Sequence, residues 1–183
     1  MRAPQTGPTG PADNRQGSMG LPEDSAPDNQ VPVMQMEVDS QNFLRTPNLH
    51  DGYIVGIHMA QKNFVRISVV DVSGRSYAMD LLGLRRFRCD GFAEGNIILS
   101  VEIISGAKPC RGPLVRLLGE VHPSVAEPYR MKHERWLADC SEEIARGSLT
   151  LVEIAPSYGC EILALCESVK IESLEAIDLG GEA

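Results

Sequence analysis

Residues 49–81 have the sequence LHDGYIVGIHMAQKNFVRISVVDVSGRSYAMDL, in which apolar and polar side chains alternate over three successive runs. A fourth alternating run begins near Ile97. The apolar odd-numbered positions are Tyr53, Val55, Ile57 and Met59, then Val65, Ile67 and Val69, then Tyr77, Met79 and Leu81, and finally Ile97, Leu99, Val101 and Ile103. Alternation with a period of two buries one face of a sheet and exposes the other. We therefore expect these odd-numbered side chains to face a core.

The connections between these runs are short. Gln61-Lys62-Asn63 is a polar turn, and Ser73-Gly74 is a two-residue hairpin signal. Gly83 predicts a bend before the basic run 84–89. Because parallel strands need long crossover connections, short turns predict an antiparallel meander.

One main helix follows the strands. Ser124-Val125-Ala126-Glu127 fits a capping box, and Gly147 fits a C-terminal cap. Two further strands, 149–154 and 161–166, are joined by a turn at 155–159 and predict a C-terminal hairpin. The apolar stripe of the helix is Tyr129, Trp136, Leu137, Cys140 and Ile144. The predicted fold is α+β, an antiparallel meander sheet with this helix packed on it.

Composition divides the chain of 183 residues into three parts. Residues 1–40 are rich in Pro and acidic side chains and lack apolar periodicity, so we expect a disordered tail. Residues 41–175 form one domain, and residues 176–183 form a frayed C-terminus. The sequence has neither a secretion signal nor an apolar run long enough to cross a membrane, and its five cysteines are scattered. These features predict a cytoplasmic protein with reduced thiols.

The net charge of −8 is concentrated toward the C-terminus, where residues 91–183 contain fifteen acidic and eight basic side chains. An acidic chain disfavours nonspecific binding to nucleic acid, which depends on neutralising phosphates. The leading hypothesis is a non-enzymatic protein-interaction module that binds a basic protein partner. Its expected contact residues are Tyr158, at a loop tip, and Glu142, Glu143, Glu153 and Glu161.

Two alternatives remain open. An enzyme or small-ligand binder would use His50 and Asp51 together with the 156–160 loop, where Cys160 is a candidate nucleophile. A nucleic-acid binder would use the basic cluster of Arg85, Arg86 and Arg88, which is also typical of a charged edge strand. The sequence contains no phosphate-binding glycine loop, Cys-x-x-Cys, His-Glu-x-x-His or nucleophile elbow. We therefore expect no catalysis, cofactor or metal.

The Leu49-His50-Asp51 turn before a strand, the following meander, and Gly95-Asn96-Ile97-Ile98 at the start of an apolar strand resemble small bacterial immunity-type proteins of polymorphic toxin systems. The resemblance covers residues 49–104. It implies a bacterial, non-enzymatic binder that blocks a toxin, and a structural role for the Leu49-His50-Asp51 turn.

Overall fold

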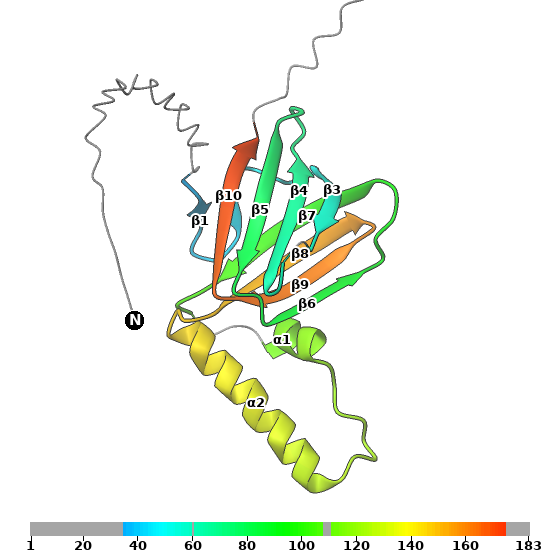
Figure 1. Cartoon of the computed structure of the whole chain (residues 1–183), viewed down its shortest axis with the longest axis vertical. Helices are drawn as coiled ribbons and strands as arrows, with labels where there is room; N and C mark the ends of the chain where they lie inside the picture. Colours follow the sequence, from blue (N-terminus) through cyan, green and yellow to red (C-terminus); the bar gives the residue numbers. More distant parts are fainter. Residues whose placement is uncertain (1–34, 60, 108–110, 175–183) are drawn as a thin grey trace, which may run out of the picture. The chain divides into compact units, whose positions relative to one another are not determined.

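The computed structural model describes residues 35–59, 61–107 and 111–174, and the expected N-terminal tail up to residue 34 and the residues from 175 onward lie outside this part. The described part contains two helices and ten strands in two antiparallel sheets, which confirms the α+β prediction (Figure 1). The elements are β1 (Glu37–Val38), β2 (Leu44–Thr46), β3 (Tyr53–His58), β4 (Phe64–Val70), β5 (Ser76–Leu82), β6 (Arg86–Asp90), β7 (Asn96–Ile104), α1 (Arg111–Leu118), α2 (Glu127–Ala145), β8 (Thr150–Tyr158), β9 (Glu161–Cys166) and β10 (Ser168–Leu174).

The larger sheet has the strand order β10-β5-β4-β3-β7-β8-β9-β6. Strands β3, β4 and β5 form the expected meander, and β8 and β9 form the expected C-terminal hairpin. The meander does not continue into β6, which pairs with β9 at the sheet edge. Strand β1 pairs with β2 in a small sheet, although it lies within the range that composition assigned to the tail.

The sheet folds back on itself because two chain segments cross from one half to the other. Strand β5 leads into β6 through Gly83, which has φ +64°, and β9 leads into β10 through Glu167. Hydrogen bonds hold the two crossings together, from Glu167 N to Leu82 O (2.9 Å) and from Arg85 N to Leu165 O (2.7 Å). The halves β3-β4-β5-β10 and β7-β8-β9-β6 thus enclose one apolar core (Figure 1).

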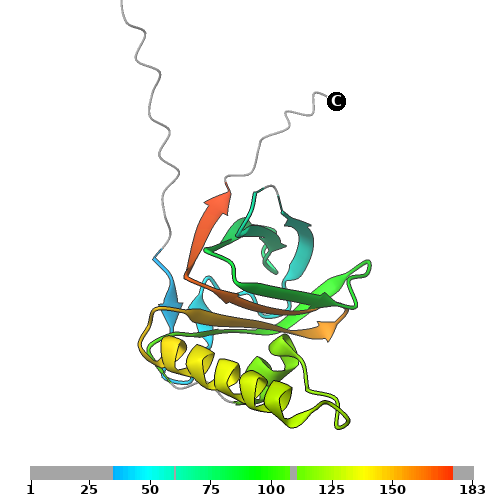
Figure 2. The same ribbon diagram turned by 60° about the horizontal axis from the view of Figure 1, so that its bottom comes forward.

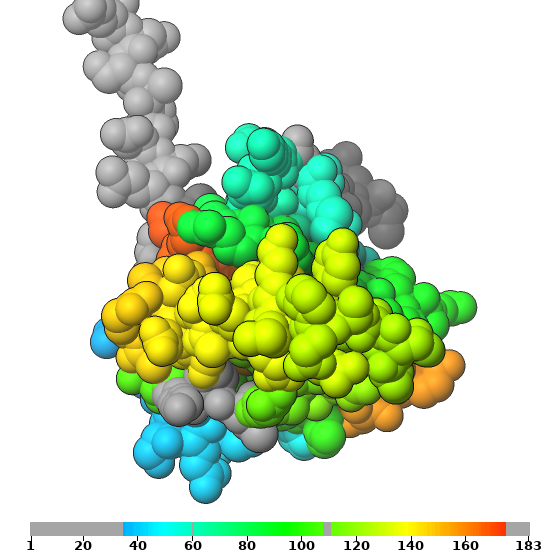
Figure 3. All heavy atoms as spheres, turned by 90° about the horizontal axis from the view of Figure 1, so that it is seen from below, coloured from blue at the N-terminus to red at the C-terminus, as the bar shows by residue number. Residues whose placement is uncertain are grey.

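The two helices form a third layer, against the outer face of β8 and β9 (Figure 2). Leu151 and Leu163 point toward the helices, whereas Val152 and Ile162 point into the main core. Helix α2 contributes the buried residues Leu137, Cys140 and Ile144 to the helix side of this contact. Residues 150–154 of β8 and 162–166 of β9 are therefore buried on both faces. The space-filling view shows α2 at the surface of the helix layer (Figure 3).

The ends of α2 test two predictions. The prediction of a capping box is wrong. The helix begins at Glu127 with Ala126 as N-cap, and the Ser124 hydroxyl contacts His122 instead. The expected cap at Gly147 is confirmed. Gly147 has φ +77°, its N–H donates to Ile144 O (2.9 Å), and the following N–H donates to Glu143 O (3.0 Å), which is the Schellman pattern.

Burial follows the predicted alternation in β4 but not in β3 and β7. In β5 the odd-numbered residues are buried as predicted, but the even-numbered Ala78 and Asp80 are buried as well. In β3, Ile54 is buried while Tyr53 and Val55 are 44% and 58% exposed. The register of β3 against β4 shifts between Ile54 and Gly56, so an extra residue turns Val55 outward and returns Ile57 to the core side. The prediction that odd-numbered residues of β3 all face the core is therefore wrong.

Strand β7 departs from the pattern for the same reason. Its register against β8 shifts twice, between Ile97 and Ile98 and between Ile98 and Ser100. Ile98 is fully buried, whereas Leu99 is 49% exposed, which reverses the expected order. Beyond these shifts, Val101 and Ile103 face the core as predicted.

Candidate functional site

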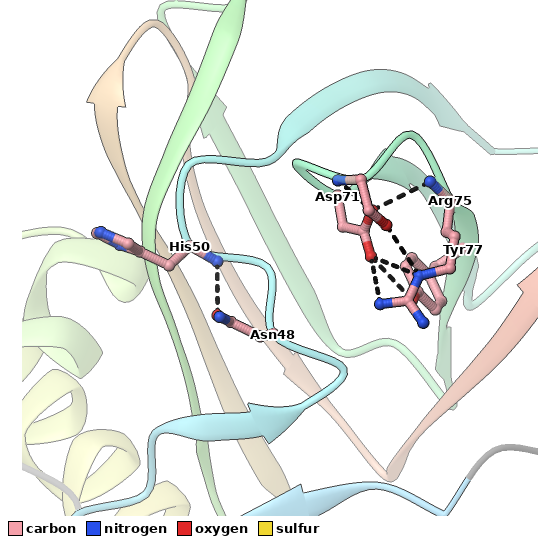
Figure 4. A network of polar contacts seen from close by, with 6 residues as sticks. Asn48, His50, Asp71, Arg75 and Tyr77 are labelled. Carbon is pink, nitrogen blue, oxygen red and sulfur yellow. Dashed lines mark hydrogen bonds and ion pairs between the residues drawn. The ribbon is translucent and has the colours of Figure 1, made fainter.

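The Leu49–Tyr53 turn is a rigid corner. The His50 backbone N–H donates to the Asn48 side-chain oxygen (3.2 Å; Figure 4), and the Gly52 N–H donates to Leu49 O (3.0 Å). Leu49 is buried beneath the turn. A Cβ atom at Gly52 would lie 2.8 Å from Val70 O, so this position has room only for glycine. The Asn48 side chain therefore supplies the capping bond of this turn.

The same turn is fixed to β7 at its irregular segment. The Asp51 N–H donates to Ile98 O (2.9 Å), and the Ile98 N–H donates to Gly52 O (2.9 Å). His50 Nδ1 lies 2.7 Å from Leu99 O. Because a carbonyl oxygen only accepts, Nδ1 must carry the proton of this hydrogen bond. The His50 imidazole thereby donates a hydrogen bond to the backbone of the exposed residue Leu99, which is a structural role.

An exposed apolar surface forms where the two halves of the sheet join. Cross-strand pairing aligns Tyr53 with Ile97 and Ile97 with Tyr158. Val55 and Leu99 lie beside them and are exposed, as are Tyr53 and Tyr158, the latter at 60%. We name Tyr53, Val55, Ile97, Leu99 and Tyr158 the outer patch. Contiguous exposed apolar side chains with aromatic members are typical of interaction sites.

A loop borders the outer patch at the end of β6. Asn96 is buried, and its side chain accepts from Ala93 N (2.9 Å) and donates to Ala93 O (2.6 Å). A Cβ at Gly91 would lie 3.1 Å from Gly159 O, so this loop lies against the turn that follows β8. Phe92 is exposed in the same loop. The loop therefore carries another exposed aromatic side chain and lies against the residue that follows Tyr158.

The residues of the proposed catalytic alternative do not converge. Strand β8 continues to Tyr158, so the expected 156–160 loop is reduced to Gly159 and Cys160. The Cys160 side chain is 1% exposed in the main core, and burial raises the pKa of its thiol to about 12. A cavity of about 90 Å³ beside His50 is lined by residues 43–45, 48–50 and 99–101, without Tyr158 or Cys160. The His50 imidazole and the Cys160 thiol therefore do not share a cavity.

The four predicted glutamates fall into two groups. Glu153 and Glu161 lie on β8 and β9, where Arg116 of α1 forms ion pairs with both. Glu153 is 9% exposed, and burial raises the pKa of its carboxyl even though Arg116 opposes that shift. Glu142 and Glu143 lie on α2, and Glu143 lines a cavity of about 330 Å³ between α2 and β6. The structure does not bring the four together as one surface.

The basic cluster lies at a sheet edge, as expected of a charged edge strand. Arg86 and Arg88 are on β6, and Arg85 precedes it. Arg85 forms an ion pair with Glu167 (2.9 Å), and the Arg86 guanidinium stacks 4.9 Å from the ring centre of Trp136. Arg88 forms an ion pair with Asp90. Each of the three arginines therefore has a contact partner within the fold.

A comparison of the chain with protein-family models, curated proteins and solved structures found no match. Among residues 35–59, 61–107 and 111–174, no three His, Cys, Asp or Glu side chains are grouped so that they could hold a metal ion. In that same part of the chain, neither helix combines the length and the apolar character needed to span a membrane.

Sequence reasoning missed most of the outer patch. It identified Tyr158 as an exposed contact residue but assigned Tyr53, Val55 and Leu99 to the core. The available signal was the presence of adjacent apolar residues at both parities, as at Ile54 and Val55, which leaves open the face that a strand buries.

Proposed function

We propose that this protein binds another protein through the outer patch. The observation that carries the proposal is the exposure of two tyrosines and two aliphatic side chains on adjacent strands, at 44% to 60%. Tyrosine combines a large apolar ring with a polar tip and is enriched at binding hot spots. The patch rests on paired strands and a clamped turn, so a partner would meet a surface that is already ordered.

The charge at the border of the patch favours a basic partner. Asp51 is exposed in the turn next to Tyr53, and Glu94 is exposed in the loop that contains Phe92. The chain as a whole carries a net charge of −8. A polar, acidic rim around an apolar centre would speed association with a basic protein and disfavour acidic ones.

The resemblance to immunity-type proteins gives this proposal a narrower form, in which the partner is a toxin that the chain blocks without catalysis. The Leu49-His50-Asp51 turn, on which the resemblance rests, supports this form of the proposal. Its hydrogen bonds hold β7, the strand that contributes Ile97 and Leu99 to the outer patch. In this form the His50 imidazole is a positioning group and takes no part in chemistry.

The test is co-expression of the full chain with the product of the adjacent gene, followed by titration calorimetry of the purified pair. Tyr158→Ser and Leu99→Ser remove patch side chains, and Tyr129→Ser is the matched control because Tyr129 is a 69% exposed tyrosine on α2. If Tyr158 is a hot spot worth about 2 kcal/mol, its loss weakens Kd roughly 30-fold. The control should leave Kd unchanged.

Two results would overturn the proposal as stated. Patch variants that bind as tightly as the wild type would place the interface elsewhere. Self-association of the wild-type chain in size-exclusion chromatography, abolished by Leu99→Ser, would show that a second copy covers the patch instead of a foreign protein.

A further inference from the structure

Two cysteines from distant parts of the sequence meet at one end of the main core. Cys89 lies on β6, and Cys160 immediately precedes β9, 71 positions later. Their Sγ atoms are 2.7 Å apart, and both thiols are free. A disulfide bond is about 2.05 Å long, so closure requires the sulfurs to approach by roughly 0.7 Å.

The strands that carry the two thiols are already held in register. Cys89 pairs with Ile162, and Asp90 pairs with Glu161, so Cys160 lies one step further along this ladder. The two backbone segments remain close past this ladder, because a Cβ atom at Gly91 would lie 3.1 Å from the carbonyl oxygen of Gly159. Small side-chain movements therefore suffice to join the sulfurs, without sliding of the strands.

We propose that Cys89 and Cys160 are an oxidisable pair that forms an intramolecular disulfide. Cys89 is half-buried, whereas Cys160 is almost fully buried, so Cys89 is the thiol that meets an external oxidant first. The remaining buried thiols of the described part, Cys140 and Cys166, lie on α2 and at the end of β9, outside this contact.

The reaction balances with a small disulfide such as oxidised glutathione as oxidant. The Cys89 thiolate attacks one sulfur of glutathione disulfide, and one glutathione thiolate leaves and takes up a proton. The Cys160 sulfur, after losing its proton, attacks Cys89 Sγ, and the second glutathione leaves. The protein loses two electrons and two protons, and one glutathione disulfide becomes two glutathione thiols.

Burial makes the second step depend on pH. Burial, together with the hydrogen bond with Cys89, raises the pKa of the Cys160 thiol to about 12, so little thiolate exists at neutral pH. Ring closure should therefore accelerate as pH rises, and the Cys89–glutathione intermediate should accumulate at lower pH.

The closed pair would join the base of the Phe92 loop to the turn after Tyr158. This site does not depend on the proposed function, because its evidence is the contact of the two sulfurs alone. Its effect would still fall beside the outer patch, where oxidation would restrict the movement of the bordering loop.

The experiment incubates the full-length chain with oxidised glutathione, alkylates the remaining thiols and maps peptides by mass spectrometry without reduction. A linked peptide containing Cys89 and Cys160 is expected, with an increased melting temperature that reductant reverses. In Cys160→Ser, glutathione should remain attached to Cys89, and in the control Cys166→Ser the Cys89–Cys160 link should persist. Wild-type chain that keeps glutathione on Cys89 at high pH, or that links other cysteines instead, would overturn the proposal.

Discussion

Replacing Asp71 should destabilise the domain more than its place in a hairpin turn suggests. Its carboxylate accepts hydrogen bonds from the backbone N–H groups of Ser73 (2.8 Å) and Arg75 (3.0 Å) and from the Tyr77 hydroxyl (3.1 Å; Figure 4). Asp71 is 4% exposed and Tyr77 is 2% exposed, so solvent cannot readily replace these bonds. The carboxylate joins the turn between β4 and β5 to the core.

The expected magnitude follows from these three donors and from the Ser73 hydroxyl, which also donates to the carboxylate (2.6 Å). A hydrogen bond to a charged acceptor contributes about 1.5 to 3 kcal/mol, and such contributions are not additive within one network. The ion pair with Arg75 adds little, because the arginine side chain is 71% exposed. Asp71→Ala should therefore lower the free energy of unfolding by about 3 to 5 kcal/mol. Asp71→Asn keeps one acceptor oxygen and should cost about half as much.

Urea denaturation followed by circular dichroism measures both variants. With a urea m-value of about 2 kcal/mol/M, a loss of 4 kcal/mol lowers the midpoint by about 2 M. Tyr77→Phe removes only the buried hydroxyl and should cost about 1 kcal/mol. If Asp71→Ala costs no more than Tyr77→Phe, the carboxylate does not organise the turn and the reasoning is wrong.

The same group makes a signed prediction about pH. Burial alone would raise the pKa of Asp71, but hydrogen bonds from Ser73, Arg75 and Tyr77 hold it far below the ordinary value of 3.8. A depressed folded-state pKa gives stability that is complete above the unfolded value and is lost as pH falls through the folded one. The stability advantage of the wild type over Asp71→Asn should therefore be constant near neutral pH and shrink in acid. An advantage that grows on acidification would contradict this assignment.

Three further predictions concern the turn before β3 and the contact of β8 and β9 with the helices. Gly52→Ala should destabilise the turn, because the new Cβ would lie 2.8 Å from Val70 O, and thermal unfolding should show a lower Tm. Leu163→Ala should cost about 3 kcal/mol in urea denaturation, since this fully buried side chain fills the contact between β9 and the helices. Burial raises the pKa of Glu153, so its ionisation opposes folding as pH rises above 4.5. The stability of the wild type relative to Glu153→Gln should therefore increase as pH is lowered from neutral toward 4.5, and a fall would show that the ion pair with Arg116 dominates.

The positions of the strands were predictable because alternation is a local signal. The runs beginning at Tyr53, Val65, Tyr77 and Ile97 each contain a strand, and Gly83 marks the bend after β5. The helix was predicted as well, although its first turn was not. Ser124 lies too early to cap a helix that begins at Glu127, and Tyr129 of the expected apolar stripe is exposed.

The candidate site was predicted only in part, because it depends on strand register. Tyr158 was identified as an exposed contact residue, and the structure places it at the end of β8. Leu99 and Val55 were assigned to the wrong face, since nothing in a run of apolar residues indicates where a bulge will fall. The contact of Cys89 with Cys160 had no local signal, because 71 positions separate the two residues.

The sequence by itself determined that the chain forms an antiparallel sheet with one main helix, because side-chain periodicity and turn residues act between near neighbours. Only the tertiary structure decided which apolar side chains remain outside. The pairing of β3 with β4 and of β7 with β8 introduces three register shifts, and these turn Val55 and Leu99 away from the core. The outer patch exists because these strand pairs contain bulges, and the position of a bulge is set by the pairing of two strands and not by the sequence of either strand alone.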